Sequence, residues 1–378
     1  MPNSYAFAYN DPSTGAAEVP LAMFKYPMNQ TNNPVALVRT LQSLSESYAT
    51  NFSYLLYNDE PSEDFRPGAN YTAPISYGHT KGVVADGGSL PGIGAQGGLW
   101  LLHSTPKFPE VTGGGQFWFP ESEITYGQTF LCMSLDTDDL DAVGEQLLLT
   151  RPFVYKATGL FRPANGTENA THPTPSGLLT ATYPALASVV AKRWNTSASG
   201  TAVRSLNSGS PGKPGLNFTS IAKNKEWGGD LWEQLVATHF GSGLLVESWI
   251  RGHALGPYCP PNATFPYMVV DAEALVATLP SGDNVTWKET QDHAKWAITT
   301  SPGVHAAANI VCVGDINRMS SQRKRGGGAV CFQDKNLHFG LLHTVLSSES
   351  CPNSTTPSTA SSREAAQTPA LASASTRP

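Results

Sequence analysis

The sequence predicts a mixed α/β fold built from short strands and several helices. Of its 378 residues, 40% are hydrophobic and only 14% are charged, which indicates an ordered chain that can bury a sizeable core. The 35 glycines and 29 prolines favour many turns between short elements and argue against a helical bundle. Apolar runs typical of strands and segments with helical spacing both occur along the chain, so both kinds of element are expected.

The first half of the chain contains four predicted elements. The apolar run Tyr54–Tyr57 predicts a buried strand that ends at the turn-forming residues 58–61. Residues 82–85 and 99–103 predict two strands joined by a glycine-rich turn, as in a hairpin. Residues 136–149 have the spacing of a helix.

The second half repeats this order of elements loosely, with a helix at 230–239 and strands at 244–250 and 267–270. A segment rich in Pro, Asn, Thr and Gly, residues 163–178, is the expected connection between the halves. We therefore predict an N-terminal αβ half over 1–165, a C-terminal αβ half over 166–351, and a disordered tail rich in Ser, Thr, Pro and Ala over 352–378.

The charge of the chain depends strongly on its histidines. The formal net charge is −6 with neutral histidines, so at pH 7 the chain lacks the positive charge that non-specific binding to nucleic acid normally needs. In acid, nine additional charges on the nine histidines would change this value to +3. We therefore expect attraction to polyanions mainly at acid pH.

Ten sequons of the form Asn-x-Ser/Thr indicate passage through the secretory pathway, because chance supplies roughly four. They begin at Asn29, Asn51, Asn70, Asn165, Asn169, Asn195, Asn217, Asn262, Asn284 and Asn353. The alternative is a cytosolic chain that happens to be rich in Ser and Thr. A lysosomal or secreted location is expected, and no run of 18 apolar residues predicts a membrane span.

Five cysteines occur, and none has the Cys-x-x-Cys spacing of a zinc site, so disulfides are the better interpretation. An odd number leaves one thiol without a partner. The segment beginning Met1-Pro2-Asn3-Ser4 has none of the sections of a signal peptide, from which we expect the true N-terminus to be missing.

Two His-x-Lys pairs, His79/Lys81 and His293/Lys295, are the candidate catalytic residues. In an extended segment the His and Lys of each pair lie on one face. Phosphodiester cleavage needs an in-line nucleophile, an acid for the leaving oxygen, and cations for the phosphate oxygens. One imidazole can form a covalent phosphohistidine, the other can protonate the leaving group, and the lysines can bind phosphate, so no metal or cofactor is required. The alternative for each pair is a surface histidine beside a solvated lysine.

The sequence around both pairs resembles the deoxyribonuclease II family. The matching motifs occur in family order over most of residues 5–351: Leu55–Pro61, Gly78–Val83, Gly98–Ser104, Thr125–Thr129, Asp292–Trp296, Cys312–Arg318 and Arg325–Gly328. The resemblance implies a phospholipase D-like fold, with a pseudo-twofold arrangement of two αβ halves whose central sheets are flanked by helices. It also implies cleavage of double-stranded DNA at acid pH without divalent metal, leaving 3′-phosphate and 5′-hydroxyl ends.

The resemblance further implies supporting residues. His103 and Ser104 would orient the histidine of the first half, and Asp315 and Asn317 that of the second. A carboxylate beside an imidazole fixes its tautomer and raises its pKa, which makes Asp315 a candidate partner. The alternatives are that Asp315 caps a turn and that His103 is a buried core residue.

The family pattern also pairs Cys312 with Cys331 and Cys259 with Cys351. It joins the counterpart of Cys132 to an N-terminal cysteine that this sequence lacks, so the partner of Cys132 stays open.

Three other patterns are weaker. Arg323-Lys324-Arg325 before three glycines could contact DNA phosphates, although short basic runs are usually only solvated. Residues 92–97 have the letters of a dinucleotide fingerprint, but the predicted strand follows them instead of preceding them. The acids at 136–141 resemble a calcium loop, yet a helix start explains them better.

These observations predict an acid endodeoxyribonuclease of double-stranded DNA, in which the order of nucleophile and acid between His79 and His293 is open. A secreted DNA-binding or toxin-like protein that has lost activity is one alternative. A phospholipase D-type enzyme acting on lipid head groups is the other, and the lack of an amphipathic membrane segment disfavours it. The oligomeric state is not predicted.

Overall fold

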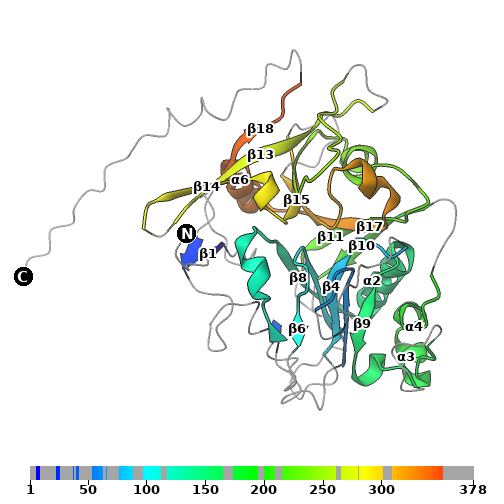
Figure 1. The fold of residues 1–378 in the computed structure, drawn as a ribbon. Coiled ribbons are helices and arrows are strands. Elements are labelled where there is room, and N and C mark those ends of the chain that lie inside the picture. The colour runs from blue at the N-terminus through cyan, green and yellow to red at the C-terminus, as the bar shows by residue number, and fades with distance from the viewer. Residues whose placement is uncertain are drawn as a thin grey trace, which may run out of the picture.

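The computed structural model describes residues 6–8, 23–25, 37, 40–41, 53–62, 65, 76–87, 97–111, 117–164, 173–194, 200–208, 215–260, 265–279, 281–300 and 309–351. These residues form two lobes, one above the other in Figure 1, and each lobe contains one large sheet. The mixed α/β fold is thereby confirmed. The tail at 352–378, residues 165–172 of the predicted connection and most of the glycine-rich segment at 92–97 lie outside the described residues.

The lower lobe contains a five-stranded antiparallel sheet with the strand order β8-β5-β4-β3-β9. Its strands are β3 (Ser53–Asn58), β4 (Lys81–Asp86), β5 (Gly97–His103), β8 (Phe130–Asp136) and β9 (Val154–Ala157). The predicted strand at 54–57 and the predicted neighbours at 82–85 and 99–103 are confirmed as β3, β4 and β5.

Three helices cover this sheet: α2 (Thr137–Thr150), α3 (Gly177–Thr182) and α4 (Pro184–Val190). The predicted helix at 136–149 is confirmed as α2. The Asp136 carboxylate caps it by accepting from the Asp139 N–H, and Asp141 accepts from the N–H groups of Ala185 and Leu186 at the start of α4. Within the described residues, no three His, Cys, Asp or Glu side chains are grouped so that they could hold a metal ion.

The upper lobe contains a nine-stranded sheet that begins β10-β11-β17-β16-β15-β12-β13-β14, with β18 also paired to β13. Its strands are β10 (Thr201–Asn207), β11 (Asn217–Lys223), β12 (Leu244–Ser248), β13 (Val269–Thr278), β14 (Asn284–Lys288), β15 (Lys295–Thr299), β16 (Ile310–Gly314), β17 (Gly327–Gln333) and β18 (Val345–Ser348). The strands predicted at 244–250 and 267–270 correspond to β12 and β13, which pair in parallel.

Shorter elements complete the described structure. The helix predicted at 230–239 is present as a π-helix, Leu231–Val236, continued by α5 (Ala237–Phe240), and α6 (Lys335–Thr344) packs on the large sheet. The 3-10 helices are Glu121–Thr125, Gly159–Phe161, Glu289–Gln291 and Ser320–Lys324. Two two-stranded sheets join β1 (Ala6–Ala8) to β2 (Met23–Lys25) and β6 (Glu110–Val111) to β7 (Phe117–Trp118).

The two lobes repeat one order of elements. The first runs β3-β4-β5-β8-α2-β9 and the second β12-β15-β16-β17-α6-β18, with β13 and β14 added. An aspartate caps the helix of each repeat, Asp136 for α2 and Asp334 for α6. Each lysine of the His-x-Lys pairs begins a strand and lies opposite the last residue of a neighbouring strand, Asn58 of β3 for Lys81 and Ser248 of β12 for Lys295. This repetition agrees with the two halves that the sequence predicts.

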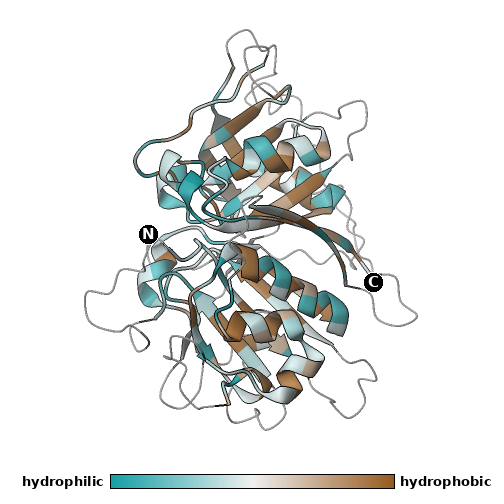
Figure 2. Cartoon of the chain, turned by 90° about the vertical axis from the view of Figure 1, so that its right-hand side faces the viewer, coloured by the Kyte–Doolittle hydropathy of each residue, from teal (hydrophilic) through white to brown (hydrophobic). Residues whose placement is uncertain are grey.

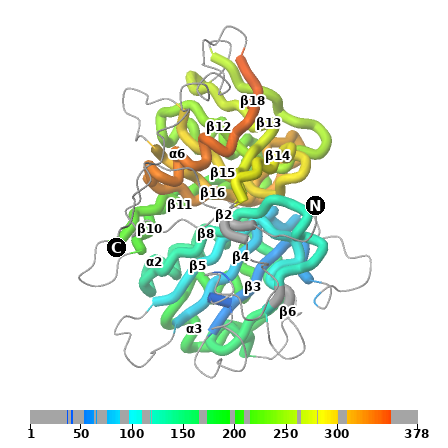
Figure 3. The backbone as a smooth tube through the Cα atoms, turned by 90° about the vertical axis from the view of Figure 1, so that its left-hand side faces the viewer, coloured from blue at the N-terminus to red at the C-terminus, as the bar shows by residue number. Residues whose placement is uncertain are grey.

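Alternating side chains of the strands form separate cores on the two faces of each sheet. Leu55 and Tyr57 of β3 belong to a core that extends into the upper lobe, whereas Tyr54 and Leu56 pack on the opposite face. Figure 2 shows the hydrophobic residues concentrated in the strands and on helix faces, and Figure 3 shows β3, β4 and β5 in one lobe and β12, β13 and β15 in the other. None of the described helices is long and apolar enough to cross a membrane.

The boundary at 165/166 stays a prediction. Helices α3 and α4 follow that position in the sequence, yet they pack with the first half, because Leu186 of α4 lies against Gly144 of α2 and shares a core with it.

Two disulfides are formed, Cys312–Cys331 and Cys259–Cys351, and both pairings implied by the family resemblance are confirmed. Cys312 and Cys331 lie directly opposite each other on β16 and β17. Cys132 is exposed on β8 and is the free cysteine of the described chain.

Candidate active site

The two His-x-Lys pairs meet at the junction of the lobes, where each histidine is held by the other half of the chain. The N–H of His79 donates to the Gly326 carbonyl at 2.7 Å, and the N–H of His293 donates to the Gly127 carbonyl at 2.8 Å. Gly326 and Gly127 both follow the 3-10 helix of their half and precede β17 and β8. The two hydrogen bonds are therefore equivalent contacts, related by the pseudo-twofold arrangement of the halves.

The lysines of the two pairs are almost completely buried, with 3% of Lys81 and 1% of Lys295 exposed. The Lys81 ammonium forms an ion pair with one carboxylate oxygen of Asp59, and the Arg325 guanidinium binds the other at 3.0 Å. The Lys295 ammonium donates to the His293 carbonyl at 2.5 Å. Three cations thus surround the site, and Asp59 neutralises part of their charge.

The cations and burial hold both imidazoles in the neutral form. Removal from water lowers the pKa of His79, and the charge of Lys81 lowers it further, against the opposing effect of Asp59. Burial lowers the pKa of His293 to about 2, with added repulsion from Lys295 and Lys81. The pKa of Lys295 falls to about 7 because of burial and the charge of Lys81. The charge of Lys81 thus lowers pKa values in the second half, and that of Lys295 lowers the pKa of His79 in the first.

The ring of His79 has a defined tautomer. Its Nδ1 lies 2.6 Å from the backbone carbonyl oxygen of Asp315, and a carbonyl only accepts, so Nδ1 carries the proton and donates it. The Nε2 atom is then left with its lone pair. For His293, the Nδ1 atom is buried and no described group meets the geometry of a hydrogen bond to it, although the Ser104 backbone lies near enough to raise the pKa of the ring against the effect of burial.

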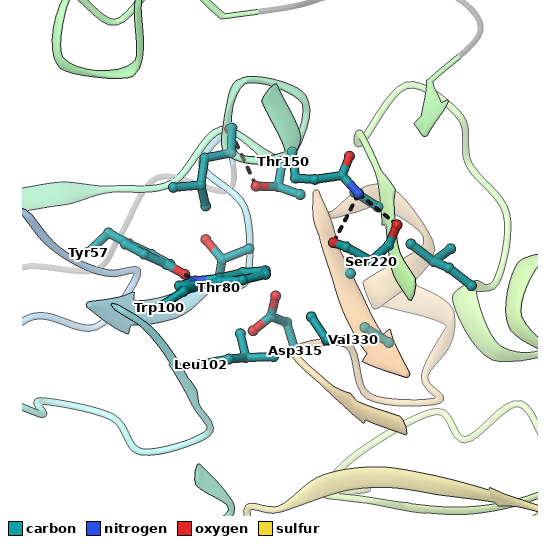
Figure 4. A pocket seen from close by; sticks show the side chains of 14 residues that line it. Tyr57, Thr80, Trp100, Leu102, Thr150, Ser220, Asp315 and Val330 are labelled. Atoms are coloured by element: carbon teal, nitrogen blue, oxygen red, sulfur yellow. Dashed lines mark hydrogen bonds between the residues drawn. The ribbon is translucent and has the colours of Figure 1, made fainter. Parts of the chain in front are cut away.

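The sequence hypothesis for Asp315 changes in its atomic detail, because Asp315 contacts His79 through its backbone carbonyl and not through its carboxylate. The side chain instead lines a cavity of about 20 Å³ between the lobes, together with Thr80 and Trp100 (Figure 4). Burial raises the pKa of the Asp315 carboxyl to about 8 although Lys81 opposes this shift, so the group is protonated in acid. Asn317, two residues further on, is buried.

Ser104 also supports the histidine of the opposite half. Its hydroxyl donates to the Gln128 side chain at 2.6 Å and accepts from the Thr129 N–H at 2.9 Å. These contacts hold the segment whose Gly127 carbonyl binds His293. Ser104 was expected to orient His79 of its own half, but its contacts support His293 of the second half. In the same way, Asp315 of the second half contacts His79 of the first.

His103 packs in an aromatic cluster at the end of β5. Its ring is 4.9 Å from that of Phe108 and 6.0 Å from that of Phe130, between centroids, and only 1% of the residue is exposed. Burial and Lys81 lower its pKa. Of the two interpretations of His103, this position favours the core residue.

The three residues of the basic run are placed differently. Lys324 is exposed and Arg323 is half-buried, whereas Arg325 turns inward and binds Asp59 and the Tyr77 carbonyl. The buried ammonium of Lys223 donates to the carbonyls of Gln322, Arg323 and Arg325 at 3.1, 3.1 and 2.6 Å. Lys223 therefore fixes the loop that carries both Arg325 and the Gly326 carbonyl.

Sequence reasoning missed several residues of this site. Asp59 lies in a predicted turn and in the motif Leu55–Pro61 but has no predicted role, and Lys223 lies in no motif. Glu247 on β12 is completely buried, and neither carboxyl oxygen has a hydrogen-bond partner among the described residues. Burial raises its pKa, reinforced by Asp292. The available signal for Glu247 was an acidic residue inside the strand predicted at 244–250.

An aromatic group borders His293. The ring of Trp249 lies 3.8 Å from the imidazole and that of Tyr126 lies 5.3 Å from it, between centroids. The carboxylate of Asp292, next to His293, accepts from the Ala294 N–H and from the Trp287 indole, so the turn that presents the histidine is rigidly bonded.

Comparison with known proteins gives consistent matches. The deoxyribonuclease II family model matches residues 1–351. A putative deoxyribonuclease-2 of Burkholderia thailandensis is 36% identical over 354 residues, which cover 91% of this chain and 84% of the relative. Plancitoxin-1 of Acanthaster planci is 33% identical over 326 residues, 84% and 76% of the two chains. Deoxyribonuclease-2-alpha of Rattus norvegicus is 31% identical over 314 residues, 82% and 77%.

Proposed function

The chain belongs to the deoxyribonuclease II family and is a nuclease that hydrolyses DNA, and we propose that it is an acid endodeoxyribonuclease that works through a phosphohistidine without a divalent metal. The observation that supports this proposal is the crossed pair of hydrogen bonds, His79 to Gly326 and His293 to Gly127, which joins the two His-x-Lys segments across the junction of the lobes. Lys81, Lys295 and Arg325 supply the positive charge that the phosphate oxygens need.

In the first step, His79 is the nucleophile, because its Nδ1–H is bound by the Asp315 carbonyl and its Nε2 lone pair is free. The Nε2 atom attacks phosphorus, and the bond from phosphorus to the 5′ oxygen breaks. That oxygen takes a proton from protonated His293 and leaves as a 5′-hydroxyl. The 3′ side of the strand remains attached to His79 as a phosphohistidine.

In the second step, neutral His293 removes a proton from water, and the resulting hydroxide attacks phosphorus. The bond from phosphorus to Nε2 breaks and restores neutral His79. The product is a 3′-phosphate, and His293 again carries the proton needed for the next cycle.

The low pKa values of both imidazoles support a requirement for acid. Burial and the lysines keep His293 neutral in the free protein, so it gains a proton only in acid and beside the negative phosphate. Double-stranded DNA is the proposed substrate. The ten sequons and the two disulfides support a lysosomal or secreted location.

Supercoiled plasmid at about pH 5 in EDTA tests the proposal. Wild type is expected to nick and linearise it, and His79→Ala and His293→Ala are expected to lose this activity. The variant Arg204→Gln, on a distant exposed ion pair with Glu145, is the matched control. A wild type that leaves the plasmid intact would indicate a homologue that has lost catalysis, and unchanged nicking by both histidine variants would exclude the mechanism.

A further inference from the structure

An exposed arginine stands next to the site. Arg251 lies in the segment that follows β12, two residues after Trp249. Its guanidinium lies 4.8 Å from the centroid of the Trp249 ring and 5.9 Å from that of Tyr126. These are the two rings that pack against His293. The aromatic group therefore connects a solvent-exposed cation directly to the general acid.

The aromatic group holds this cation in place. The Trp249 indole donates to the Thr290 carbonyl at 3.1 Å, which fixes the plane of its ring. A guanidinium over an aromatic face is attracted by the ring quadrupole and loses part of its side-chain freedom. Arg251 is thus ordered before any ligand binds, which reduces the entropic cost of a contact with an anion.

The charge of Arg251 is also available. No ion pair that includes Arg251 occurs among the described residues, whereas Arg204, Arg318 and Arg325 each bind a carboxylate. A chain with a formal net charge of −6 has no general attraction for a polyanion near neutrality, so local cations must supply the contact.

A second exposed cation lies in a neighbouring segment. The segment after Arg251 runs beside the segment that leads to Lys324, because Ala254 pairs with Met319 and the Ser320 N–H donates to the His253 carbonyl at 3.1 Å. Lys324 is exposed as well. The two adjacent segments thus each carry an exposed cation.

We propose that Arg251, supported by Trp249 and Tyr126, is a subsite for the phosphate that neighbours the scissile phosphate on a nucleic-acid strand. This inference rests on the proposed function and adds the second phosphate contact. The guanidinium binds the non-bridging oxygens through its N–H groups, while the aromatic rings keep it beside the leaving-group side of the site, where His293 acts. Arg251 touches no reacting atom and is a binding residue.

The test measures binding of a fluorescent DNA duplex at about pH 5 in EDTA, in a His79→Ala background that prevents cleavage. The dissociation constant is followed by anisotropy over a range of NaCl concentrations. Arg251→Gln is expected to reduce the slope of log K against log [NaCl] by about 0.9, the value for one lost phosphate contact. Arg251→Lys is expected to retain the slope, because it retains the charge, but to bind more weakly without the aromatic contact. Arg204→Gln is the control and is expected to match the parent.

Cleavage in the native background separates the two proposals. Arg251→Gln is expected to raise KM for duplex DNA more than it lowers kcat, and to affect bis(p-nitrophenyl) phosphate, which has no neighbouring phosphate, much less. If wild type cleaves DNA and the salt slope of Arg251→Gln equals that of the parent, the subsite is overturned while the function stands. If wild type does not cleave but the slope falls as expected, the subsite stands and the function fails.

Discussion

His79 and His293 occupy equivalent positions, two residues before the lysines that begin β4 and β15, yet their surroundings differ. The residue after β3 is Asp59, which forms ion pairs with both Lys81 and Arg325. The residue after β12 is Trp249, whose ring packs on His293. One half-site is ionic and the other is aromatic. The backbone contacts that place the two histidines are repeated, whereas the surrounding side chains differ, which agrees with the different roles proposed for the two imidazoles.

The largest expected effect distinguishes the roles of the two histidines. His293→Asn is expected to lower kcat by about 10²–10⁴-fold, the range for loss of a general acid, and still to form a protein–DNA adduct slowly through His79 at acid pH. His79→Asn is expected to form no adduct. Denaturing gels with end-labelled DNA measure this. If only the His79 variant formed an adduct, His293 would be the nucleophile and His79 the general acid.

The ionic half-site predicts a large effect on stability. Asp59→Asn leaves the Lys81 ammonium buried without its counter-charge, which costs about 3–5 kcal/mol in unfolding free energy. Urea unfolding at constant pH measures the change. Glu145→Gln breaks the half-exposed pair with Arg204 and is expected to cost about 1 kcal/mol or less. Equal losses in both variants would mean that the Asp59 pair contributes no more than a surface pair.

A pH effect of intermediate size comes from the acid that contacts His79. The folded pKa of Asp315, about 8, lies above its unfolded value near 3.8, so between these values the folded state holds a proton that the unfolded state has lost. Stability is therefore lost as the pH rises. Relative to Asp315→Asn, wild type is expected to lose up to about 1.4 kcal/mol per pH unit between pH 6 and 8.

Unfolding of both proteins by urea at several pH values provides the measurement. Taking the difference between wild type and Asp315→Asn removes the contributions of the other titrating groups. A constant difference across this range would show that Asp315 is already ionised in the folded protein.

The smallest effect belongs to the aromatic half-site. Trp249→Leu removes a ring contact of the kind that contributes about 0.5–1.5 kcal/mol, so kcat is expected to fall by about 2- to 13-fold. The pH profile of kcat is expected to move with it, because His293 becomes more accessible to water. Trp249→Phe retains a ring and serves as the control. If Trp249→Leu raised KM and left kcat unchanged, a role of Trp249 in positioning His293 would be contradicted.

Much of the fold was predictable from local pattern. The strands β3, β4, β5 and β12, the helix α2 and the loose repetition of elements follow from apolar runs, glycine-rich turns and helical spacing, each of which acts over a few residues. The His-x-Lys spacing also predicted the four central residues of the candidate site, since alternation along an extended chain is a local property.

Local pattern could not predict that each histidine is supported by residues of the opposite half. Asp315 contacts His79 through a backbone carbonyl, and a carbonyl is present at every position, so no residue type signals it. Ser104 acts on His293 through the segment 127–129, and Arg325 leaves the surface because Asp59, 266 residues away in the sequence, lies within its reach.

The sequence by itself therefore determined the α/β elements, the two candidate His-x-Lys pairs and the family, because these depend on side-chain type and short spacing. Only the tertiary structure decided which half holds each histidine, which acids are buried without partners, and that one half-site is ionic and the other aromatic. Those properties depend on which residues of distant segments come into contact, and burial and Coulomb forces act through that contact.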